Sequence, residues 1–361
     1  RTKTKLTTKI QGGVNMKNMD INKQDKLKDL LESGDAKAFA EFYTEDQQAI
    51  IDSIMADIEA HGDSVDLNNE SQMKELGLRA LSKQERRYYN AVIEKTTFDD
   101  TELVFPRTVF DKVFEDLRQQ HPLLSEVQFV NTTGLTEWIF RTQDVEAAWW
   151  GKLCEPIKKQ LENGFRKESL SLFKLSAFIP MCKSMLHLAP NWLDRFVREM
   201  LYESLALGLE KAIVIGTGSD EPIGITKDLG GAVVEGVYPD KSAVAISDFS
   251  PKTIGTEIML PFVDGKIRKP DSLVIVVNPA DYWGVFFPMT TTQDVNGNYH
   301  TTNLPYPFKV VQSTFMEAGK MVIGNMKDYF LGIGAPERIE YSDEYRFLED
   351  DRVYIAKVLA N

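Results

Sequence analysis

The sequence is poor in cysteine, in histidine and in long apolar runs, and each shortage excludes a class of protein. Two cysteines, Cys154 and Cys182, are too few for a disulfide-stapled secreted domain and do not form a CxxC pair, so we expect both thiols to stay reduced. The four histidines show no metal-ligand spacing. No apolar run approaches the roughly 20 residues that span a bilayer. We therefore predict a protein without a metal site or a membrane segment.

Basic residues are also in the minority. Lysine and arginine number 42 against 54 aspartates and glutamates, which gives a formal net charge of -12. Such a chain repels a phosphate backbone, so a dedicated nucleic-acid-binding protein is not expected. The stretch GTGSDEPIG at 216–224 has the glycines of a phosphate loop, but it closes a predicted helix and no Gly-Lys-Ser/Thr follows. Because no nucleophile elbow or catalytic histidine context occurs either, we predict no catalytic or cofactor-binding residues.

The sequence does contain the apolar content of a folded chain, with 43% hydrophobic residues. Residues 1–15 read as a tag or an upstream extension, because candidate start methionines follow at Met16 and Met19. Residues 16–95 have apolar positions at spacings of three and four, which predicts amphipathic helices. We favour a small helical bundle for this segment, with coiled-coil association as the alternative.

The composition changes near residue 98. An apolar run interrupted by Pro106 precedes a short helical pattern that ends at His121-Pro122, which predicts an extended arm and a helix. Residues 136–150 and 168–183 are rich in β-formers, and the stretch between them is polar and lysine-rich. We expect two strands joined by a long excursion that needs support from a neighbouring chain.

A helix of about 24 residues, roughly 36 Å long, is predicted next. Asn191 is the expected N-cap, and Gly216 and Gly218 are expected to end the helix with positive φ. The remainder reads as mixed α/β, with a helix at 251–261, a buried strand SLVIVVNP, a helix ADYWGVFF, and strands at 309–312 and 320–323. The tail from residue 338 is strand-like.

In this order, the stretches LVFPRTVFDKVF, AAWWGKLCEPIKKQLENGFRK, APNWLDRFVREMLYESLALGLEKAIVIGTGSDEPIGI, VVNPADYW and RIEYSDEYRFLEDDRVYIAKVL resemble the major capsid proteins of tailed bacteriophages with the Hong Kong 97 fold. The resemblance covers residues 103–361. It implies an α+β fold with an N-terminal arm, an E-loop, a spine helix, and peripheral and axial domains. The implied divisions are a scaffold-like helical segment (16–95), the arm and short helix (96–130), a peripheral domain (131–228) with its E-loop (148–170) and spine helix (190–215), an axial domain (229–335), and a return to the peripheral domain (336–361).

The resemblance assigns assembly roles to particular residues. Those of the E-loop are Lys152, Glu155, Lys158, Lys159, Arg166 and Lys167. Those of the arm are Phe105, Pro106, Phe110 and Phe114. The cap and turn of the spine helix are Asn191, Gly216, Gly218, Pro222 and Gly224. Some relatives cross-link an E-loop lysine to an asparagine of a neighbour, but RFLEDDRVYIAKVL has no asparagine at the matching place. We predict no cross-linking.

The function implied is that of a structural, non-enzymatic subunit of an icosahedral phage or prophage head. It would assemble in the host bacterial cytoplasm into a procapsid of hexamers and pentamers, and enclose DNA without strong specific binding. Portal, maturation protease and decoration proteins are candidate partners. One alternative is an encapsulin-like cargo compartment. Another is a carbohydrate-binding or hydrolytic protein that uses the aromatic cluster of Trp138, Phe140, Trp149 and Trp150.

Overall fold

The structure is a computed structural model of the chain, and it describes a part of the residues. The described residues are 52–54, 56–57, 60, 70–94, 106–131, 136–141, 165–170, 173–182, 189–263, 272–336, 340–342 and 351–360. The predicted extension at 1–15, the first predicted helices of the N-terminal segment, and residues 148–164 of the predicted E-loop lie outside them.

The chain forms two compact units. Unit 1 comprises residues 1–119, 176–207 and 336–357, and unit 2 comprises residues 120–175, 208–335 and 358–361. Strand β4 (Phe173–Cys182), helix α6 (Pro190–Ile215) and strand β12 (Asp351–Ala360) each have several residues in both units. The division into peripheral and axial domains stays a prediction.

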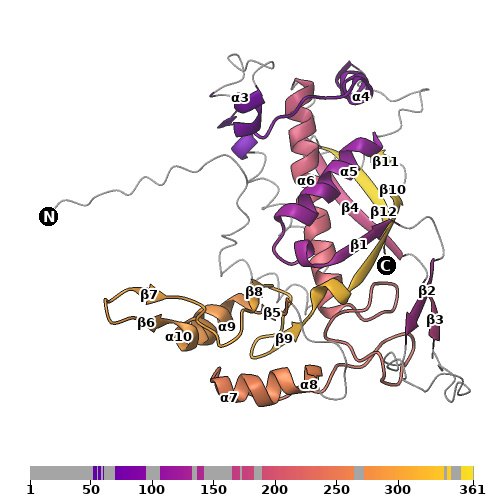
Figure 1. Cartoon of the computed structure of the whole chain (residues 1–361). Coiled ribbons are helices and arrows are strands. Elements are labelled where there is room, and N and C mark those ends of the chain that lie inside the picture. Colours follow the sequence, from indigo (N-terminus) through magenta and orange to yellow (C-terminus); the bar gives the residue numbers. More distant parts are fainter. Residues whose placement is uncertain are drawn as a thin grey trace, which may run out of the picture. The chain divides into compact units, whose positions relative to one another are not determined.

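Helices α3 (Glu70–Glu75), α4 (Lys83–Glu94) and α5 (Arg107–Gln120) follow one another in unit 1 (Figure 1). Only the last residue of α5 falls in unit 2. Helix α4 starts with a capping box, because the Glu85 amide donates to Ser82 Oγ at 3.2 Å and the Ser82 amide donates to the Glu85 carboxylate at 2.8 Å. Helix α5 buries one apolar stripe, as its periodicity predicts. The buried members of that stripe are Val109, Phe110, Val113 and Leu117.

Helix α6 occupies the predicted range, but Asn191 is not its N-cap. The helix starts at Pro190, and the amides of Trp192 and Leu193 donate to the carbonyl of Ala189. Proline is well suited to the first helical position because its φ is already helical and no N–H is left unpaired there. The Asn191 side chain instead donates to the carbonyl oxygen of Arg79 at 2.8 Å.

The end of α6 is closed by the chain that returns at residues 224–226. The amides of Gly224 and Ile225 donate to the carbonyls of Gly216 and Ile213 at 2.8 and 2.7 Å, and Thr226 Oγ1 donates to Val214 at 2.9 Å. These donors satisfy carbonyls that a helix end leaves unpaired. The prediction of a positive φ is confirmed at Gly218, where φ is 90°.

For Gly216 that prediction was wrong, because Gly216 is not among the positive-φ glycines. Glycine is needed there for space: a Cβ would lie 2.2 Å from the Pro222 carbonyl oxygen and 2.4 Å from the Ala212 carbonyl oxygen. A Cβ on Gly224 would likewise meet the Gly216 nitrogen at 2.7 Å. The predicted glycine turn is therefore a close approach of two backbone segments.

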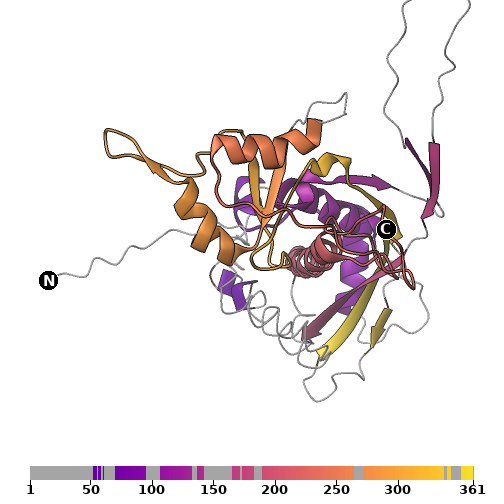
Figure 2. The ribbon, with the colours of Figure 1, turned by 90° about the horizontal axis from the view of Figure 1, so that it is seen from below.

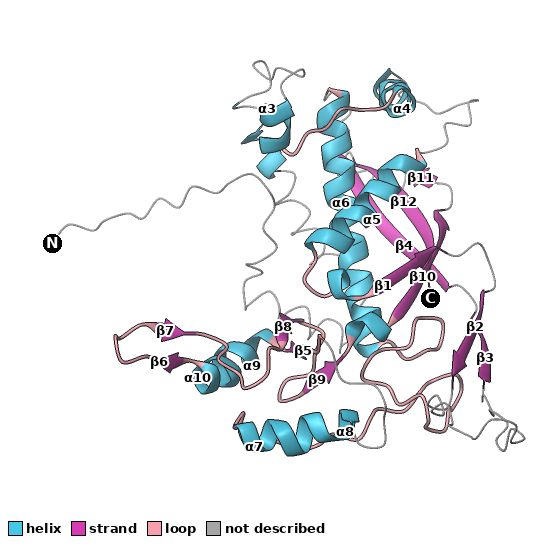
Figure 3. Ribbon diagram, in the orientation of Figure 1, coloured by secondary structure: helices cyan, strands magenta, loops and turns pink. Residues whose placement is uncertain are grey.

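The largest sheet has five strands in the order β1 (Gln128–Asn131), β10 (Phe330–Pro336), β12 and β11 (Glu340–Ser342), with β4 also paired to β12 (Figure 3). Strand β1 runs parallel to β10, and β11 runs antiparallel to β12. The sequence predicted one strand over 168–183. Two strands occur there instead: β3 (Phe165–Leu170) pairs with β2 (Thr136–Arg141), and β4 belongs to the five-stranded sheet.

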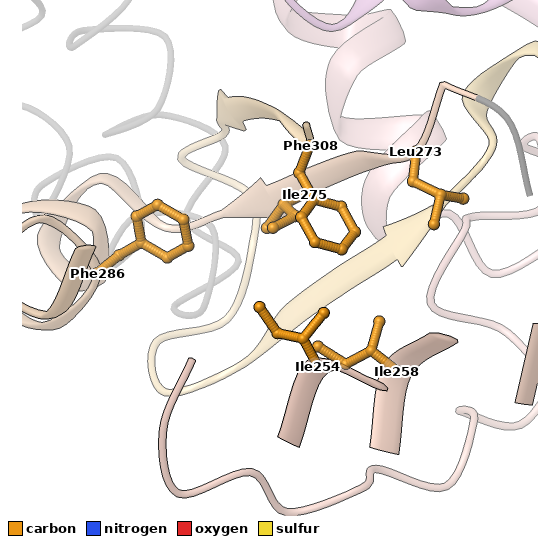
Figure 4. Close-up of a cluster of buried hydrophobic side chains, with 6 residues drawn as sticks. All are labelled: Ile254, Ile258, Leu273, Ile275, Phe286 and Phe308. Carbon is orange, nitrogen blue, oxygen red and sulfur yellow. The ribbon is translucent and has the colours of Figure 1, made fainter. Parts of the chain in front are cut away.

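A second, three-stranded sheet in unit 2 is built around β5 (Val274–Val277). This strand lies between β8 (Lys309–Gln312), which runs parallel to it, and β9 (Met321–Gly324), which runs antiparallel. All four residues of β5 are buried, which agrees with the strand predicted from SLVIVVNP. Six side chains form the core cluster beside it (Figure 4): Ile254, Ile258, Leu273, Ile275, Phe286 and Phe308.

Two helices that pack on this core contain π-helical turns. In the first, α7 (Pro251–Thr253), η4 (Ile254–Met259) and α8 (Leu260–Val263) are continuous; in the second, α9 (Pro279–Asp281), η5 (Tyr282–Phe286) and α10 (Phe287–Thr290) are continuous. Each π turn ends two residues before a proline, Pro261 or Pro288. Proline clashes with the carbonyl four residues earlier, and the wider π turn moves that carbonyl away. The first helix therefore passes through Pro261, where the sequence predicted its end.

Candidate assembly surfaces

The α9–η5–α10 helix exposes apolar side chains along the face that points away from its core. Phe286 is buried and contacts Phe249 edge to face at 4.9 Å, whereas Trp283 is 55% exposed. Val285 and Met289 are also exposed, and the Trp283 ring lies 5.2 Å from that of Phe287. An exposed aromatic and aliphatic face of this kind is typical of a protein contact, because single exposed apolar residues are common but grouped ones are not.

A short hairpin, β6 (Thr292–Gln293) and β7 (Tyr299–His300), continues from α10. In Figures 1 and 2 it extends away from the end of that helix. Its turn is rigid, because Asp294 accepts hydrogen bonds from the amides of Asn296 and Asn298 at 2.8 and 2.9 Å. These bonds lower the pKa of Asp294, with the Asn298 amide as the largest cause. Val295 at the tip and Tyr299 are exposed, so the hairpin presents apolar groups on a preformed turn.

A second exposed hairpin lies in the segment that follows α6, which is drawn as loop in Figure 3. Val234 and Val237 bond to each other in both directions, at 3.1 and 2.9 Å. Between them Glu235 and Gly236 both have positive φ, 52° and 84°, as a two-residue type I′ turn requires. Five apolar side chains of this segment are exposed: Leu229, Val233, Val234, Val237 and Val244. We call the whole segment from Leu229 to Val244, with this turn at its tip, the valine hairpin.

The valine hairpin is fixed to the end of α6. The Tyr238 amide donates to the Thr217 carbonyl at 3.0 Å, and Lys241 Nζ donates to the Ile225 carbonyl at 2.8 Å. Burial lowers the pKa of the Lys241 ammonium. Glu221 stabilises the loop that directly follows α6, because its carboxylate accepts hydrogen bonds from the amide and the hydroxyl of Thr217 at 2.8 and 2.9 Å. An exposed apolar turn on a rigid base loses little conformational entropy when it binds.

The structure brings together a buried polar group that the sequence did not indicate. His121 Nε2 lies 3.2 Å from the Glu210 carboxylate, and Ser313 Oγ donates to the same carboxylate at 2.5 Å. His121 Nδ1 accepts from the Leu124 amide at 3.2 Å, so the neutral tautomer with a proton on Nε2 satisfies both contacts. All three side chains are buried. The group joins α6 to two distant segments of unit 2 and is a structural junction.

The residues predicted to act in the E-loop are described only in part. Lys152, Glu155, Lys158 and Lys159 lie outside the described residues. Arg166 and Lys167 are on β3, where they pair with Phe140 and Ile139 of β2. Two paired strands, β2 and β3, therefore flank the polar stretch between them, and the role of the E-loop side chains stays a prediction. Of the aromatic cluster, Trp149 and Trp150 also lie outside the described residues.

The predicted arm residues lie at and in helix α5. Phe110 is 1% exposed and belongs to the buried stripe of α5, and its role in assembly stays a prediction. Pro106 is also buried, and its carbonyl accepts from the Val109 amide at 3.1 Å at the start of the helix. Phe114 is half-buried and keeps the predicted role as a prediction. Phe105 lies outside the described residues.

Within the described residues, no group of three or more histidine, cysteine, aspartate or glutamate side chains could hold a metal ion. Within the same residues, no helix is both long and apolar enough to cross a membrane.

The sequence matches the phage capsid family over residues 102–359, well over half of the chain. No curated protein matches it. Similar solved structures include the capsid of the native GTA particle (14% identity, 74% of this chain and 89% of that chain, TM-score 0.42) and the satellite phage P4 procapsid with its size determination protein (12%, 78% and 93%, 0.45). A virus-like particle from Pyrococcus furiosus is also similar (8%, 72% and 94%, 0.38).

The chain belongs to the phage capsid family. It is accordingly a structural subunit of a phage head, with the α+β capsid fold that the sequence predicted. The encapsulin-like, carbohydrate-binding and hydrolytic alternatives are not favoured by this match.

Proposed function

We propose that the chain assembles with copies of itself into hexamers and pentamers, and that these close into an icosahedral shell around a DNA genome in the host bacterial cytoplasm. Its role is structural and non-catalytic. Portal, maturation protease and decoration proteins are its proposed partners. Membership of the phage capsid family supports this proposal most directly.

The exposed apolar surfaces of unit 2 support the same proposal. The α9–η5–α10 face and the valine hairpin differ in shape and lie on different segments of the unit. A twofold dimer uses one patch on both partners, whereas a ring requires two different patches that meet head to tail. Two unlike apolar surfaces on one unit therefore suit a ring-forming capsomer. We propose that the E-loop and Phe114 add further contacts, and many modest contacts per subunit sum to a stable shell.

Sedimentation velocity of the purified chain tests the contribution of these surfaces. Trp283→Ser removes the largest exposed apolar side chain of the α9–η5–α10 face, and Lys327→Ser changes an exposed polar residue of the same unit as a control. The wild type and K327S should sediment as capsomers or larger particles, and W283S should shift toward slower species. If W283S assembles at the same concentration as the wild type, the α9–η5–α10 face is not an assembly surface.

The acidic balance supports a shell wall that does not hold DNA tightly. With a formal charge of -12 per chain, many subunits together repel a phosphate backbone. Assembled shells should therefore show no retention of double-stranded DNA at physiological salt in a filter-binding assay. Strong retention would overturn this part of the proposal.

A further inference from the structure

The last part of the N-terminal helical segment is tied to the start of α6 by a buried charge network. At its centre is Arg79, which lies between α3 and α4. Its guanidinium donates to both oxygens of Asp194 at 2.9 and 2.7 Å and to both oxygens of Glu85 at 3.1 and 2.8 Å. Paired bonds of this kind are among the strongest between charged side chains. Arg79 thus joins the segment to the spine helix through Asp194, and it is held in place by Glu85 of the segment's own helix α4.

The network is balanced in charge and largely buried. Asp194 is completely buried and also accepts from Arg198 Nε at 2.9 Å and from the Tyr89 hydroxyl at 3.0 Å. Burial raises the pKa of Tyr89 well above its ordinary value, so the phenol keeps the proton that it donates. Two arginines therefore face two carboxylates, Asp194 and Glu85. A buried ion pair of this kind is tolerated only while every partner is present.

Helix α5 and the backbone around Arg79 complete the attachment. Thr108 Oγ1 of α5 donates to Glu85 at 2.6 Å, and Arg198 Nη2 donates to the Gly77 carbonyl at 2.9 Å. The segment also contributes apolar side chains to the core of unit 1. Its buried hydrophobic residues are Met73, Leu78, Tyr88, Tyr89 and Val92. Residues 70–94 are thus bound to α5 and α6 by polar contacts, and they contribute buried apolar side chains of their own.

We propose that residues 70–94 are a permanent clamp on the spine helix, so that any maturation cleavage of the N-terminal segment removes only residues before Glu70. The N-terminal segment, residues 16–95, is predicted from the sequence as one scaffold-like piece. It would then consist of a removable first part and a permanent second part. A cut after Glu94 would take Arg79 and Tyr89 away from Asp194 and would leave that carboxylate buried with Arg198 alone. The part of the proposal that concerns maturation rests on the proposed function.

Limited trypsin digestion of the unassembled full chain, read by mass spectrometry, tests the clamp without assembly. Lys83, Arg86 and Arg87 are exposed tryptic sites on α4. In the wild type they should be cut at least tenfold more slowly than in Arg79→Ala. Arg107→Ala is the matched control, because that arginine is largely exposed and makes only a 3.8 Å pair with Asp111. It should digest like the wild type.

Asp194→Asn is the second variant, because it keeps the shape of the side chain and all tryptic sites. It should also speed cleavage at Lys83, Arg86 and Arg87, while the far-ultraviolet circular dichroism of the chain stays that of a folded protein. Equal cleavage rates in the wild type and D194N would overturn the clamp. If D194N does not fold, rapid cleavage of the wild type at these three sites would overturn it instead.

The mass of the subunit in purified heads tests the maturation part. The expected mature chain starts at or before Glu70, and a chain that starts after Glu94 would overturn the proposal. Absence of any heads would count against the proposed function and not against the clamp, because the digestion is done on the unassembled chain.

Discussion

Replacement of Gly216 by alanine should strongly destabilise the subunit. The added Cβ would lie 2.2 Å from the Pro222 carbonyl oxygen and 2.4 Å from the Ala212 carbonyl oxygen. Both obstacles are backbone atoms, so no side-chain rotation relieves them. Forcing an extra carbon into a packed site costs about 1–3 kcal/mol and occasionally more. Because two backbone segments must separate and the bond from the Gly224 amide to the Gly216 carbonyl is put at risk, we expect about 3 kcal/mol.

Gly255→Ala provides the matched control for this change. Gly255 lies in the helical turns of η4, and a Cβ there would meet nothing within 4 Å. Alanine at such a helical position should stabilise the chain by about 0.5–1 kcal/mol, because it restricts the unfolded chain. The two glycine substitutions are therefore predicted to act in opposite directions.

Urea denaturation of the unassembled subunit, followed by far-ultraviolet circular dichroism, measures both variants. The denaturation midpoint should fall for G216A and rise slightly for G255A at an unchanged slope. A midpoint for G216A within error of the wild type would refute the reasoning, because it would mean that the α6 terminus and the Pro222 loop are not in close contact.

Three further predictions follow from buried groups. Glu210→Ala leaves two buried donors, His121 Nε2–H and the Ser313 hydroxyl, without their acceptor, and should lower the free energy of unfolding by about 1–3 kcal/mol in urea denaturation. A loss well below about 1 kcal/mol would contradict the junction. Phe286→Ala should cost about 3–5 kcal/mol in the same assay, because it empties the core beside β5; a value near zero would mean that the site is not packed as described. For Glu85, burial raises the carboxyl pKa, but bonds from Arg79, Thr108 and the Ser82 amide outweigh burial and lower the pKa from 4.5 to about 2. A lowered folded pKa gives stability that is present above pH about 4.5 and is lost as the pH falls toward 2. Thr108→Val removes one of the bonds that lower the Glu85 pKa, so the midpoint pH of acid unfolding, followed by circular dichroism, should rise. An unchanged midpoint pH would count against the bond between Thr108 and Glu85.

The regular elements could be predicted because their signals are local. The spacing of three and four fixed the range of α6, and the four-residue apolar run of β5 indicated a buried strand. The order of these elements also identified the family. Predictions from such patterns fail where a second segment decides the outcome. Asn191 has the chemistry of an N-cap, yet Pro190 takes the first helical position and the amide side chain bonds to Arg79 instead.

The candidate surfaces and the clamp were less predictable because their partners are distant in sequence. Asp194 and Arg79 are 115 residues apart, and Ser313 and Glu210 are 103 residues apart. A charged residue in an amphipathic helix is normally assigned to a solvated face, so nothing marked Asp194 or Glu210 as buried. The exposed face of α9–η5–α10 was similarly hidden, because YWGVFFPM is apolar on all sides and its π turn changes which residues face outward.

Electron microscopy of the purified full chain is the most direct test of the claim that this protein builds a shell from copies of itself. The proposed function predicts closed icosahedral particles, or capsomers and tubes where closure fails, made of this chain alone. Discrete monomers at high protein concentration would contradict it.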